Sequence, residues 1–319
     1  MVQPVLSLAG VLSVLNYPAF DPDIVHFGQF HIRWYGVAYM AGFVLGYLVL
    51  RRLVRIGRMR MSDDALADLI AWLVVGVMVG GRGGWWTFYH RPPLPPAPPE
   101  PWWEPIAVWH GGMSFHGGFI GVVAVLVLFC YRRRLPFLNA ADCLALVTPI
   151  GLCLGRLANF INQELCGRVS YVPWAMKFPV FARYENPVLP RHPSQLYESF
   201  LEGPVLLACL WLIDRKARPR DGRTAAMFII LYSLIRFAVE FTREPDSQLG
   251  FIAFGWLTMG QLLSAAFAVA GAIWLLKIIR RPQIDTGMNP RPAAAPDARQ
   301  PPGRSPSSKK PRRGPAGRG

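Results

Sequence analysis

Charged residues are scarce in this sequence. Asp, Glu, Lys and Arg make up 17% of its 319 residues, whereas hydrophobic residues make up 52%. Without residues 282–319, which are polar and rich in proline, the remainder is too apolar for an ordinary soluble domain. Stretches of about 20 apolar residues recur along it, and each is long enough to cross ~30 Å of hydrocarbon. The sequence therefore predicts an all-α, polytopic membrane protein.

Cysteine is also sparse. The five cysteines are Cys130, Cys143, Cys153, Cys166 and Cys209. They form no CxxC pair, and none has a histidine at metal-ligand spacing. Four lie within or at the ends of apolar stretches, where a free cysteine usually behaves as a small hydrophobic residue. We assign the cysteines no chemistry, and we predict neither a metal nor another cofactor.

Acidic residues are outnumbered, because 19 Asp and Glu face 34 Lys and Arg, for a formal net charge of +15. Such an excess can indicate nucleic-acid binding. Here, however, the positive charge lies mostly in short connections and in residues 286–319, which carry eight Lys/Arg against one Asp. A basic segment of this kind is more often held at an anionic membrane surface or left in the cytoplasm. We predict no nucleic-acid partner, and a disordered, basic, Pro-rich cytoplasmic tail at 282–319.

Hydropathy predicts about seven transmembrane helices. Their approximate bounds are 32–50, 65–86, 112–131, 140–161, 195–213, 224–242 and 254–278. Positive charge concentrates in alternate connections: residues 51–60 hold five Arg, 132–134 three Arg, and 214–223 five Lys/Arg. The positive-inside rule then predicts an external N-terminus and a cytoplasmic C-terminus. Residues 1–281 form the transmembrane domain, with residues 164–193 as a small extracytoplasmic cap.

Polar side chains gather at one level of these spans. A charge at mid-bilayer costs at least ~2.5–3.5 kcal/mol on insertion scales, so it needs a partner or a purpose. With the predicted orientation, the polar groups of six spans lie at their outer ends, within ~10 Å of the boundary at the helical rise. They are Arg33, Tyr35, Arg82, His110, His116, Arg156, Asn159, Asn162, His192, Tyr197, Glu198, Arg236, Glu240 and Arg243.

Helical spacing groups some of these residues further. Two sets of three share a helix face: Arg156, Asn159 and Gln163, and Arg236, Glu240 and Arg243. In the stretch SFHGGFIG, His116 precedes a GxxxG pair formed by Gly117 and Gly121, which allows close helix approach. We therefore expect His116 to stand in a narrow crevice, where a backbone or a ligand comes near.

Structural roles could explain each residue alone. Arg236 and Glu240 could be an i,i+4 ion pair that neutralises its own charge. Asn159 could form an interhelical hydrogen bond that stabilises the packing by ~0.6 kcal/mol. His116 could be a hydrogen-bonded interface histidine. These readings leave unexplained why several arginines, a histidine and two tyrosines gather at one depth. The excess positive charge predicts an anion, and a phospholipid phosphate is the obvious one, because arginine binds phosphate bidentately.

Five motifs carry a resemblance to a known family. They are FDPDIVHFGQFHIRWYG, GGMSFHGGFIG, GRLANFINQELCGR, RHPSQLYE and RFAVEFTREPD. In this order, and over most of residues 20–280, the chain resembles the bacterial prolipoprotein diacylglyceryl transferases. The resemblance implies an inner-membrane enzyme that moves the diacylglyceryl group of phosphatidylglycerol onto a thiol. The acceptor would be the lipobox cysteine in the signal peptide of a prolipoprotein, with glycerol phosphate as the by-product.

The resemblance also implies functional positions. The family's motif residues fall on Tyr35, His116, Arg156, Asn159, Glu164, His192, Tyr197, Arg236 and Glu240. Around Arg82, the chain has Gly83 and Trp85 where the family tends to have a larger aliphatic residue and a tyrosine. We expect His116, Arg156, Arg236 and Glu240 to be catalytic. The expected substrate-binding residues are Tyr35, Arg82, Asn159, Asn162, Glu164, His192, Tyr197 and Arg243.

Forming a thioether requires a thiolate and a stabilised leaving phosphate. We assign Arg156 and Arg236 to the phosphate, with Asn159 orienting it, and Glu240 to orienting Arg236. Glu164 would orient Arg156 or the cap. His116 is the candidate base, or alternatively a lipid ligand.

Other classes of protein remain open at this point. They are a non-catalytic lipid- or anion-binding transporter, an intramembrane protease and a lipoprotein-binding scaffold. A transporter would usually place its polar groups near the midplane, between repeated halves. A protease would need a nucleophile, for which Ser114 is a weak candidate because no GxSxG motif surrounds it.

Overall fold

The computed structural model describes residues 15–18, 20–27, 30–90, 101–216, 220–245 and 250–280. The chain separates into two units, Met1–Arg280 and Arg281–Gly319, and all described residues belong to the first. The basic tail predicted at 282–319 lies outside the described residues, so its disorder and location stay predictions.

Seven helices in the described part of the chain are long and apolar enough to cross a membrane, which confirms the predicted number. They are α1 (Trp34–Arg55), α2 (Asp63–Phe88), α3 (Phe115–Arg133), α4 (Phe137–Ile161), a broken helix over Ser194–Arg215, α7 (Arg223–Val239) continued by the 3-10 turn η5 (Glu240–Thr242), and α8 (Met259–Arg280). The last helix begins five residues later than predicted. A turn precedes it, in which Phe254 and Gly255 have positive φ and the Ile252 amide donates to the Leu257 carbonyl.

The fifth span is interrupted near its middle. It consists of α5 (Ser194–Phe200), a single π-helical turn η4 (Leu201–Val205) and α6 (Leu206–Lys216). Pro204 lacks an amide hydrogen, and its ring clashes with the carbonyl four residues earlier in a regular helix. Gly203 takes a non-helical conformation, and a Cβ there would lie 2.6 Å from the Cβ of Cys153 on α4. The kink therefore brings this span close against α4.

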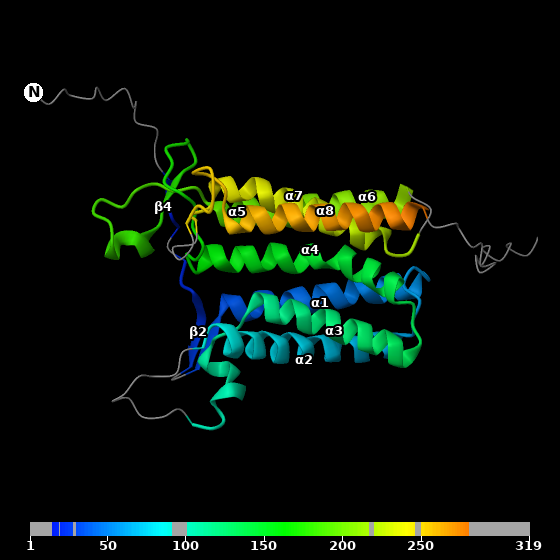
Figure 1. Ribbon diagram of the computed structural model, residues 1–319. Coiled ribbons are helices and arrows are strands. Elements are labelled where there is room, and N and C mark those ends of the chain that lie inside the picture. The colour runs from blue at the N-terminus through cyan, green and yellow to red at the C-terminus, as the bar shows by residue number, and fades with distance from the viewer. Residues whose placement is uncertain are drawn as a thin grey trace, which may run out of the picture. The chain divides into compact units, whose positions relative to one another are not determined.

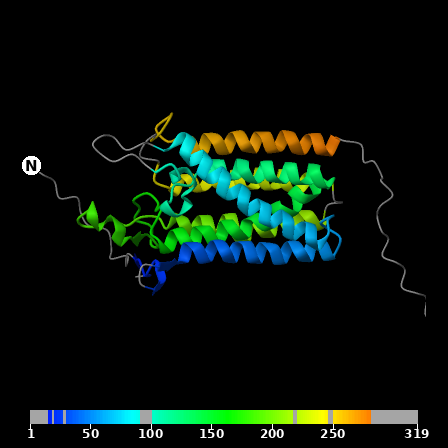
Figure 2. The same cartoon turned by 90° about the horizontal axis from the view of Figure 1, so that it is seen from below.

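The helix α4 is the centre of the bundle. It packs against α1 on one side and against α5, α6 and α7 on the other, while α2 pairs with α3 and α7 pairs with α8 (Figure 1). Figure 2 shows α2 running obliquely to the other helices. The predicted close approach at Gly117 and Gly121 is confirmed, because a Cβ on either would stand under 3 Å from backbone atoms of α2 at Gly80 and Gly76.

One end of the bundle holds most of the apolar core and the arginine-rich connections. Buried leucines of α1, α2, α4 and α6, such as Leu50, Leu66, Leu146 and Leu210, pack there. Beside them lie three charged residues that we call the Arg58 cluster: Arg58, Asp142 and Asp214. Arg58 binds Asp214 through Nη2 at 2.6 Å and Nε at 3.1 Å, and Nη2 lies 3.7 Å from Asp142.

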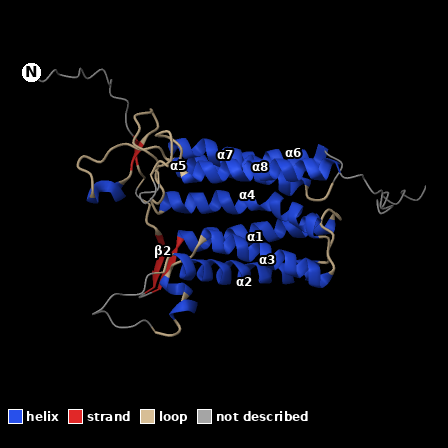
Figure 3. Cartoon of the chain, viewed as in Figure 1, coloured by secondary structure: helices blue, strands red, loops and turns tan. Residues whose placement is uncertain are grey.

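The opposite end carries the short strands and the longest connections (Figure 3). Strand β1 (Leu15–Asn16) pairs in parallel with β4 (Met176–Lys177), and β2 (Asp23–Phe27) pairs antiparallel with β3 (Phe30–Arg33). A small apolar cluster that includes Tyr17, Phe160 and Phe178 ties residues 164–193 to the end of α4. These residues therefore lie at this end of the helices, and their role as an extracytoplasmic cap stays a prediction.

Candidate functional site

Six charged side chains meet at the end of the bundle covered by residues 164–193. We call them the Arg–Glu cluster: Arg156 on α4, Glu198 on α5, Glu202 on η4, Arg236 on α7, Glu240 on η5, and Arg243 just after it. All three carboxylates are buried. A charge in such surroundings persists only when it is paired and hydrogen-bonded.

Glu198 joins the three arginines. One carboxylate oxygen lies 2.8 Å from Nε of Arg156, and the other lies 2.8 Å from Nη1 of Arg243 and 4.0 Å from Nη1 of Arg236. The side chain has no exposed surface. Glu198 therefore sets the spacing between guanidinium groups that come from two different helices and a loop.

Arg156 is bound to the carboxylates of the cluster through its Nε atom only. Its Nε lies 2.8 Å from Glu198 and donates to Glu202 at 3.3 Å. An arginine has five N–H donors, four of them on the two terminal nitrogens. Among the described residues, those four terminal donors of Arg156 make no hydrogen bond, and the side chain is 18% exposed. The terminal fork is therefore free to bind an anion bidentately.

Glu240 holds the other side of the cluster. It lies 2.5 Å from Nη1 of Arg236 and 3.5 Å from Nε of Arg243. The hydroxyl of Thr258 donates to the same carboxylate at 2.9 Å. Gly260 makes room for it, since a Cβ there would lie 2.7 Å from a carboxylate oxygen. The i,i+4 pair of Arg236 and Glu240 exists, but it is one part of a larger network.

The expectation of excess positive charge is wrong for this cluster. Its three arginines face three carboxylates, of which Glu198 and Glu202 come from the broken fifth span. The cluster is formally neutral. An anion would therefore bind to unused N–H donors of the cluster and not to an excess of positive charge.

The end of α4 presents amide groups beside Arg156. Asn159 donates to Glu164 at 3.0 Å, and Asn162 donates to the same carboxylate at 3.4 Å. The helix ends at Ile161, so Gln163 does not extend the face of Arg156 and Asn159 as expected; it has a positive φ and accepts from the Val180 amide. Glu164 binds the two asparagines, whereas Glu198 and Glu202 hold Arg156.

Two tyrosines of α1 lie beside this end of α4. The hydroxyls of Tyr35 and Tyr39 are 3.3 Å apart, and their rings are in contact. Arg156 and Glu164 are both close enough to Tyr39 to act on it electrostatically. Tyr35 therefore approaches the site through Tyr39, a residue to which the sequence analysis gave no role.

His116 lies at the start of α3, and its side chain is exposed. Its ring contacts that of Phe115 edge-on, and it makes no hydrogen bond to a described residue. The prediction that His116 stands in a narrow crevice is wrong. The backbone of α2 occupies the space beside the glycines that follow His116. The structure thus brings Arg156, Arg236, Glu240 and Arg243 together and gives His116 no contact with them among the described residues.

Arg82 points into a different part of this end. It is buried and donates to the carbonyls of Glu104, Pro105 and Gly111, at 2.6, 3.1 and 2.5 Å. Its guanidinium lies 4.7 Å from the ring centre of Trp85, a cation–π distance. These contacts attach the segment between α2 and α3 to the bundle. A contact of Arg82 with lipid stays a prediction.

His192 and Tyr197 form a separate hydrogen-bonded chain that links residues 164–193 to α5. The Trp174 indole donates to the Tyr197 hydroxyl at 2.6 Å, and that hydroxyl lies 3.2 Å from Nδ1 of His192. Because the indole can only donate, the Tyr197 hydroxyl can give its own proton to His192. Burial lowers the pKa of His192, which favours its neutral form.

Comparison with known proteins identifies the family. A family model described as prolipoprotein diacylglyceryl transferase matches residues 22–277. The chain belongs to the prolipoprotein diacylglyceryl transferase family. A phosphatidylglycerol–prolipoprotein diacylglyceryl transferase of Azospirillum brasilense is 48% identical over 276 residues, which cover 84% of this chain and 97% of the relative. A protein of the same name from Chromohalobacter salexigens is 44% identical over 275 residues, which cover 86% and 98%.

Within this diacylglyceryl transferase, two members of the Arg–Glu cluster were missed by sequence reasoning. Glu198 was placed at the right level without a role, and Glu202 was not singled out. Gln195, Glu198 and Glu202 are spaced i, i+3 and i+7 in an apolar span, and all three are fully buried. Two acids on one face of a membrane helix are a signal that buried arginines lie opposite.

Proposed function

We propose that this chain transfers the diacylglyceryl group of phosphatidylglycerol to the lipobox cysteine of a prolipoprotein, the first step of lipoprotein maturation. Membership of the transferase family and seven membrane-spanning helices support this activity. The observation that carries the proposal is the free terminal fork of Arg156, held beside Arg236 by buried carboxylates. A phospholipid phosphate has the charge and the planar oxygen pairs that such a fork binds.

The reaction makes one bond and breaks one. The cysteine sulfur, as a thiolate, attacks the glyceryl carbon that bears the phosphate. The C–O bond breaks with its electrons going to oxygen, and glycerol phosphate leaves. Charge therefore grows on the phosphate in the transition state, where pre-positioned arginine donors stabilise it. Arg156 and Arg236 bind this phosphate, and Glu198, Glu202 and Glu240 keep their guanidinium groups in place without reorganisation.

Other residues at this end bind the rest of the substrates. Asn159 and Asn162, fixed by Glu164, line the phosphate site from the end of α4, with Tyr35 approaching from α1. Arg243 completes the ring of guanidinium groups around Glu198. The hydrogen-bonded chain of His192 and Tyr197 attaches the cap to α5.

The reacting thiol comes from the substrate and not from this chain. Cys166 belongs to the motif GRLANFINQELCGR, five residues after the end of α4, and it is buried. Burial raises its pKa to about 11, so only a very small fraction is thiolate at neutral pH.

His116 is our candidate for the base that takes the proton of the substrate thiol. Its exposed ring leaves it accessible to a peptide at this end of α3. The alternative is that His116 binds lipid. We expect His116→Gln to remove the acidic limb of the pH dependence of kcat/KM. An unchanged acidic limb in this variant would rule out the role as base.

The Arg–Glu cluster faces the outer leaflet of the bacterial inner membrane. The described parts of the Lys/Arg-rich connections at 51–60, 132–134 and 214–223 lie at the opposite end of the helices (Figure 1). Positive connections usually stay in the cytoplasm. This arrangement supports a site that a secreted prolipoprotein reaches from outside, with residues 164–193 as an extracytoplasmic cap.

One experiment tests the activity directly. Membranes containing the chain are incubated with phosphatidylglycerol labelled in its acyl chains and with a lipobox peptide. We expect label on the peptide cysteine and release of glycerol phosphate, and no label on a matched peptide with serine in its place. Binding of labelled lipid without transfer would instead support a lipid-binding transporter or scaffold.

A further inference from the structure

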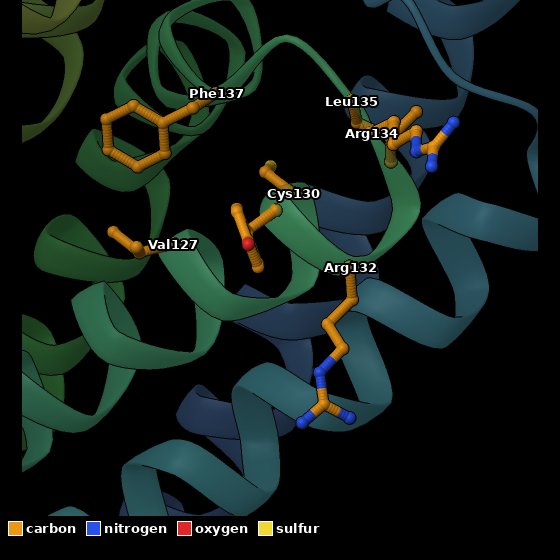
Figure 4. Close-up of a pocket in the computed structure, with 7 residues that line it drawn as sticks. Val127, Cys130, Arg132, Arg134, Leu135 and Phe137 are labelled. Atoms are coloured by element: carbon orange, nitrogen blue, oxygen red, sulfur yellow. The ribbon is translucent and has the colours of Figure 1, made fainter.

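A hollow of about 960 Å³ lies at the end of the bundle opposite the Arg–Glu cluster. Figure 4 shows it between the last turn of α3 and the first turn of α4. It is lined by Val127, Cys130, Tyr131, Arg132, Arg134, Leu135 and Phe137. One side of the lining is apolar, and the other side carries two guanidinium groups.

The three consecutive arginines at the end of α3 differ in their partners. Arg133 donates to Asp68 on α2 at 2.7 Å, and its guanidinium lies 5.5 Å from the ring centre of Phe129. The side chains of Arg132 and Arg134 make neither an ion pair nor a hydrogen bond with any described residue. The arginine that is neutralised by the protein lies outside the hollow, and the two that are not line it.

The backbone fixes one of these arginines at the rim. Arg134 has φ of 54°, in the left-handed region, and its amide donates to carbonyls of the last turn of α3. The end of a helix carries about half a negative charge, which disfavours an anion. Two unpaired guanidinium groups outweigh that partial charge, so the rim of the hollow attracts anions.

The apolar side faces the hydrocarbon. Val127 and Tyr131 are one helical turn apart on α3, and both are exposed on a helix long enough to span a membrane. Phe137 opposes them from the start of α4. A ligand that fills the hollow must therefore have an anionic group at the membrane boundary and a hydrocarbon chain that runs along α3.

We propose that this hollow binds an anionic phospholipid, with its head group at the arginines that line it and one acyl chain against Val127 and Phe137. Basic hollows at the boundary of membrane helices are suited to such head groups. This lipid is separate from the substrate, because no residue of the Arg–Glu cluster lines the hollow. The proposal goes beyond the transferase reaction and does not depend on it.

The test counts lipid bound to the full chain in detergent by native mass spectrometry, with dioleoyl phosphatidic acid as the probe. We expect Arg132→Gln/Arg134→Gln to weaken one bound lipid at least about tenfold, a loss of ~1.4 kcal/mol. The matched control is Arg52→Gln/Arg55→Gln, which removes two exposed charges from the same end of α1 and should bind as the wild type does.

Two further arms separate the parts of the proposal. Val127→Trp fills the apolar side without changing charge, and it should also weaken that lipid at least about tenfold while the thermal midpoint stays near that of the wild type. Inorganic phosphate at the same concentration should not displace the lipid. Equal binding by the hollow variant and the control, or equal binding of phosphatidylcholine, would overturn the proposal.

Discussion

The two ends of the helix bundle use the same chemistry in different ways. Each end buries arginine and carboxylate side chains together. In the Arg58 cluster, Arg58 binds Asp214 through two nitrogens, and Asp142 accepts the amides of Gly222 and Ala225 at 2.8 Å each. Every buried polar atom of this cluster has a hydrogen-bond partner.

The hydrogen bonding of the Arg–Glu cluster is much less complete. Four of its buried atoms have no hydrogen-bond partner of good geometry among the described residues, although three of them lie in ion pairs. They are Glu198 Oε2, Glu202 Oε1, Arg236 Nη1 and Glu240 Oε2. Buried polar groups in proteins are almost always satisfied, so a group of exceptions calls for a reason. The comparison separates a cluster that stabilises the fold from one that retains capacity for a ligand.

The hydrogen bonding of the Arg58 cluster is complete because the cluster lies at a helix terminus. Asp142 is a residue of α4, and its carboxylate lies against the start of α7, where unpaired amides and the positive end of the helix dipole favour a carboxylate. At the other end, the fifth span contributes Glu198 and Glu202 from within a kinked helix, whose amides are already used. Among the described residues, arginine side chains are the partners of those acids.

Replacing Arg156 with lysine should produce the largest effect. Lysine keeps the charge near Glu198 but loses the planar fork that we assign to the phosphate. We expect kcat/KM for diacylglyceryl transfer to fall by about 10²-fold or more, with little change in the thermal midpoint. Arg58→Lys is the matched control: it should lower the thermal midpoint and leave kcat/KM nearly unchanged. Similar kinetic losses in both variants would remove the distinction between the two ends.

Glu198→Gln should have the next largest effect. Glutamine has the same shape, so the packing of α5 is kept, but the acid shared by Arg156, Arg236 and Arg243 is gone. We expect kcat/KM to fall by about tenfold or more, since each 1.36 kcal/mol of lost transition-state stabilisation is tenfold. Measuring KM for phosphatidylglycerol separately shows whether the arginines still bind the lipid. Wild-type kinetics in this variant would exclude a positioning role for Glu198.

Asp142→Asn should affect stability and not catalysis. Asparagine keeps one of the two oxygens that accept the Gly222 and Ala225 amides and replaces the other with an NH2 donor, and it leaves Arg58 with one acid instead of two. We expect a loss of ~1–3 kcal/mol of unfolding free energy, seen as a lower thermal midpoint in detergent. Per folded molecule, kcat should stay within about twofold of the wild type, since stability changes far from a site leave its geometry intact. A large drop in kcat at an unchanged midpoint would contradict the comparison.

The difference between the ends also explains what the sequence could and could not predict. Seven helices follow from apolar length, and the level of the polar groups follows from topology, so Arg156 and Arg236 were placed at one end correctly. Charge balance does not follow in this way. Arg156 and Glu202 are 46 positions apart, and only the packing of the kinked span against α4 brings them together.

Local geometry limited two other predictions. The GxxxG pair after His116 indicated a close approach, but the sequence did not show that Gly76 and Gly80 of α2 fill it. Helical spacing carried Gln163 onto the face of Arg156, whereas the chain leaves the helix after Ile161. In the first case the pattern predicted the close approach correctly and left its partner open. In the second it carried the helix past its end, so the predicted position of Gln163 was wrong.

The smallest effect that we expect concerns the cap, which belongs to neither cluster. Burial lowers the pKa of His192, so the folded state disfavours its protonation. Below the ordinary pKa of about 6.5, the unfolded chain binds the proton more readily, and stability falls as pH falls. Protonation would also end the hydrogen bond that Nδ1 accepts from Tyr197. We expect the thermal midpoint of the wild type to drop between pH 7.5 and 5.5, and His192→Gln to drop less. An equal drop in both proteins would show that His192 does not contribute to the acid sensitivity of this end of the bundle.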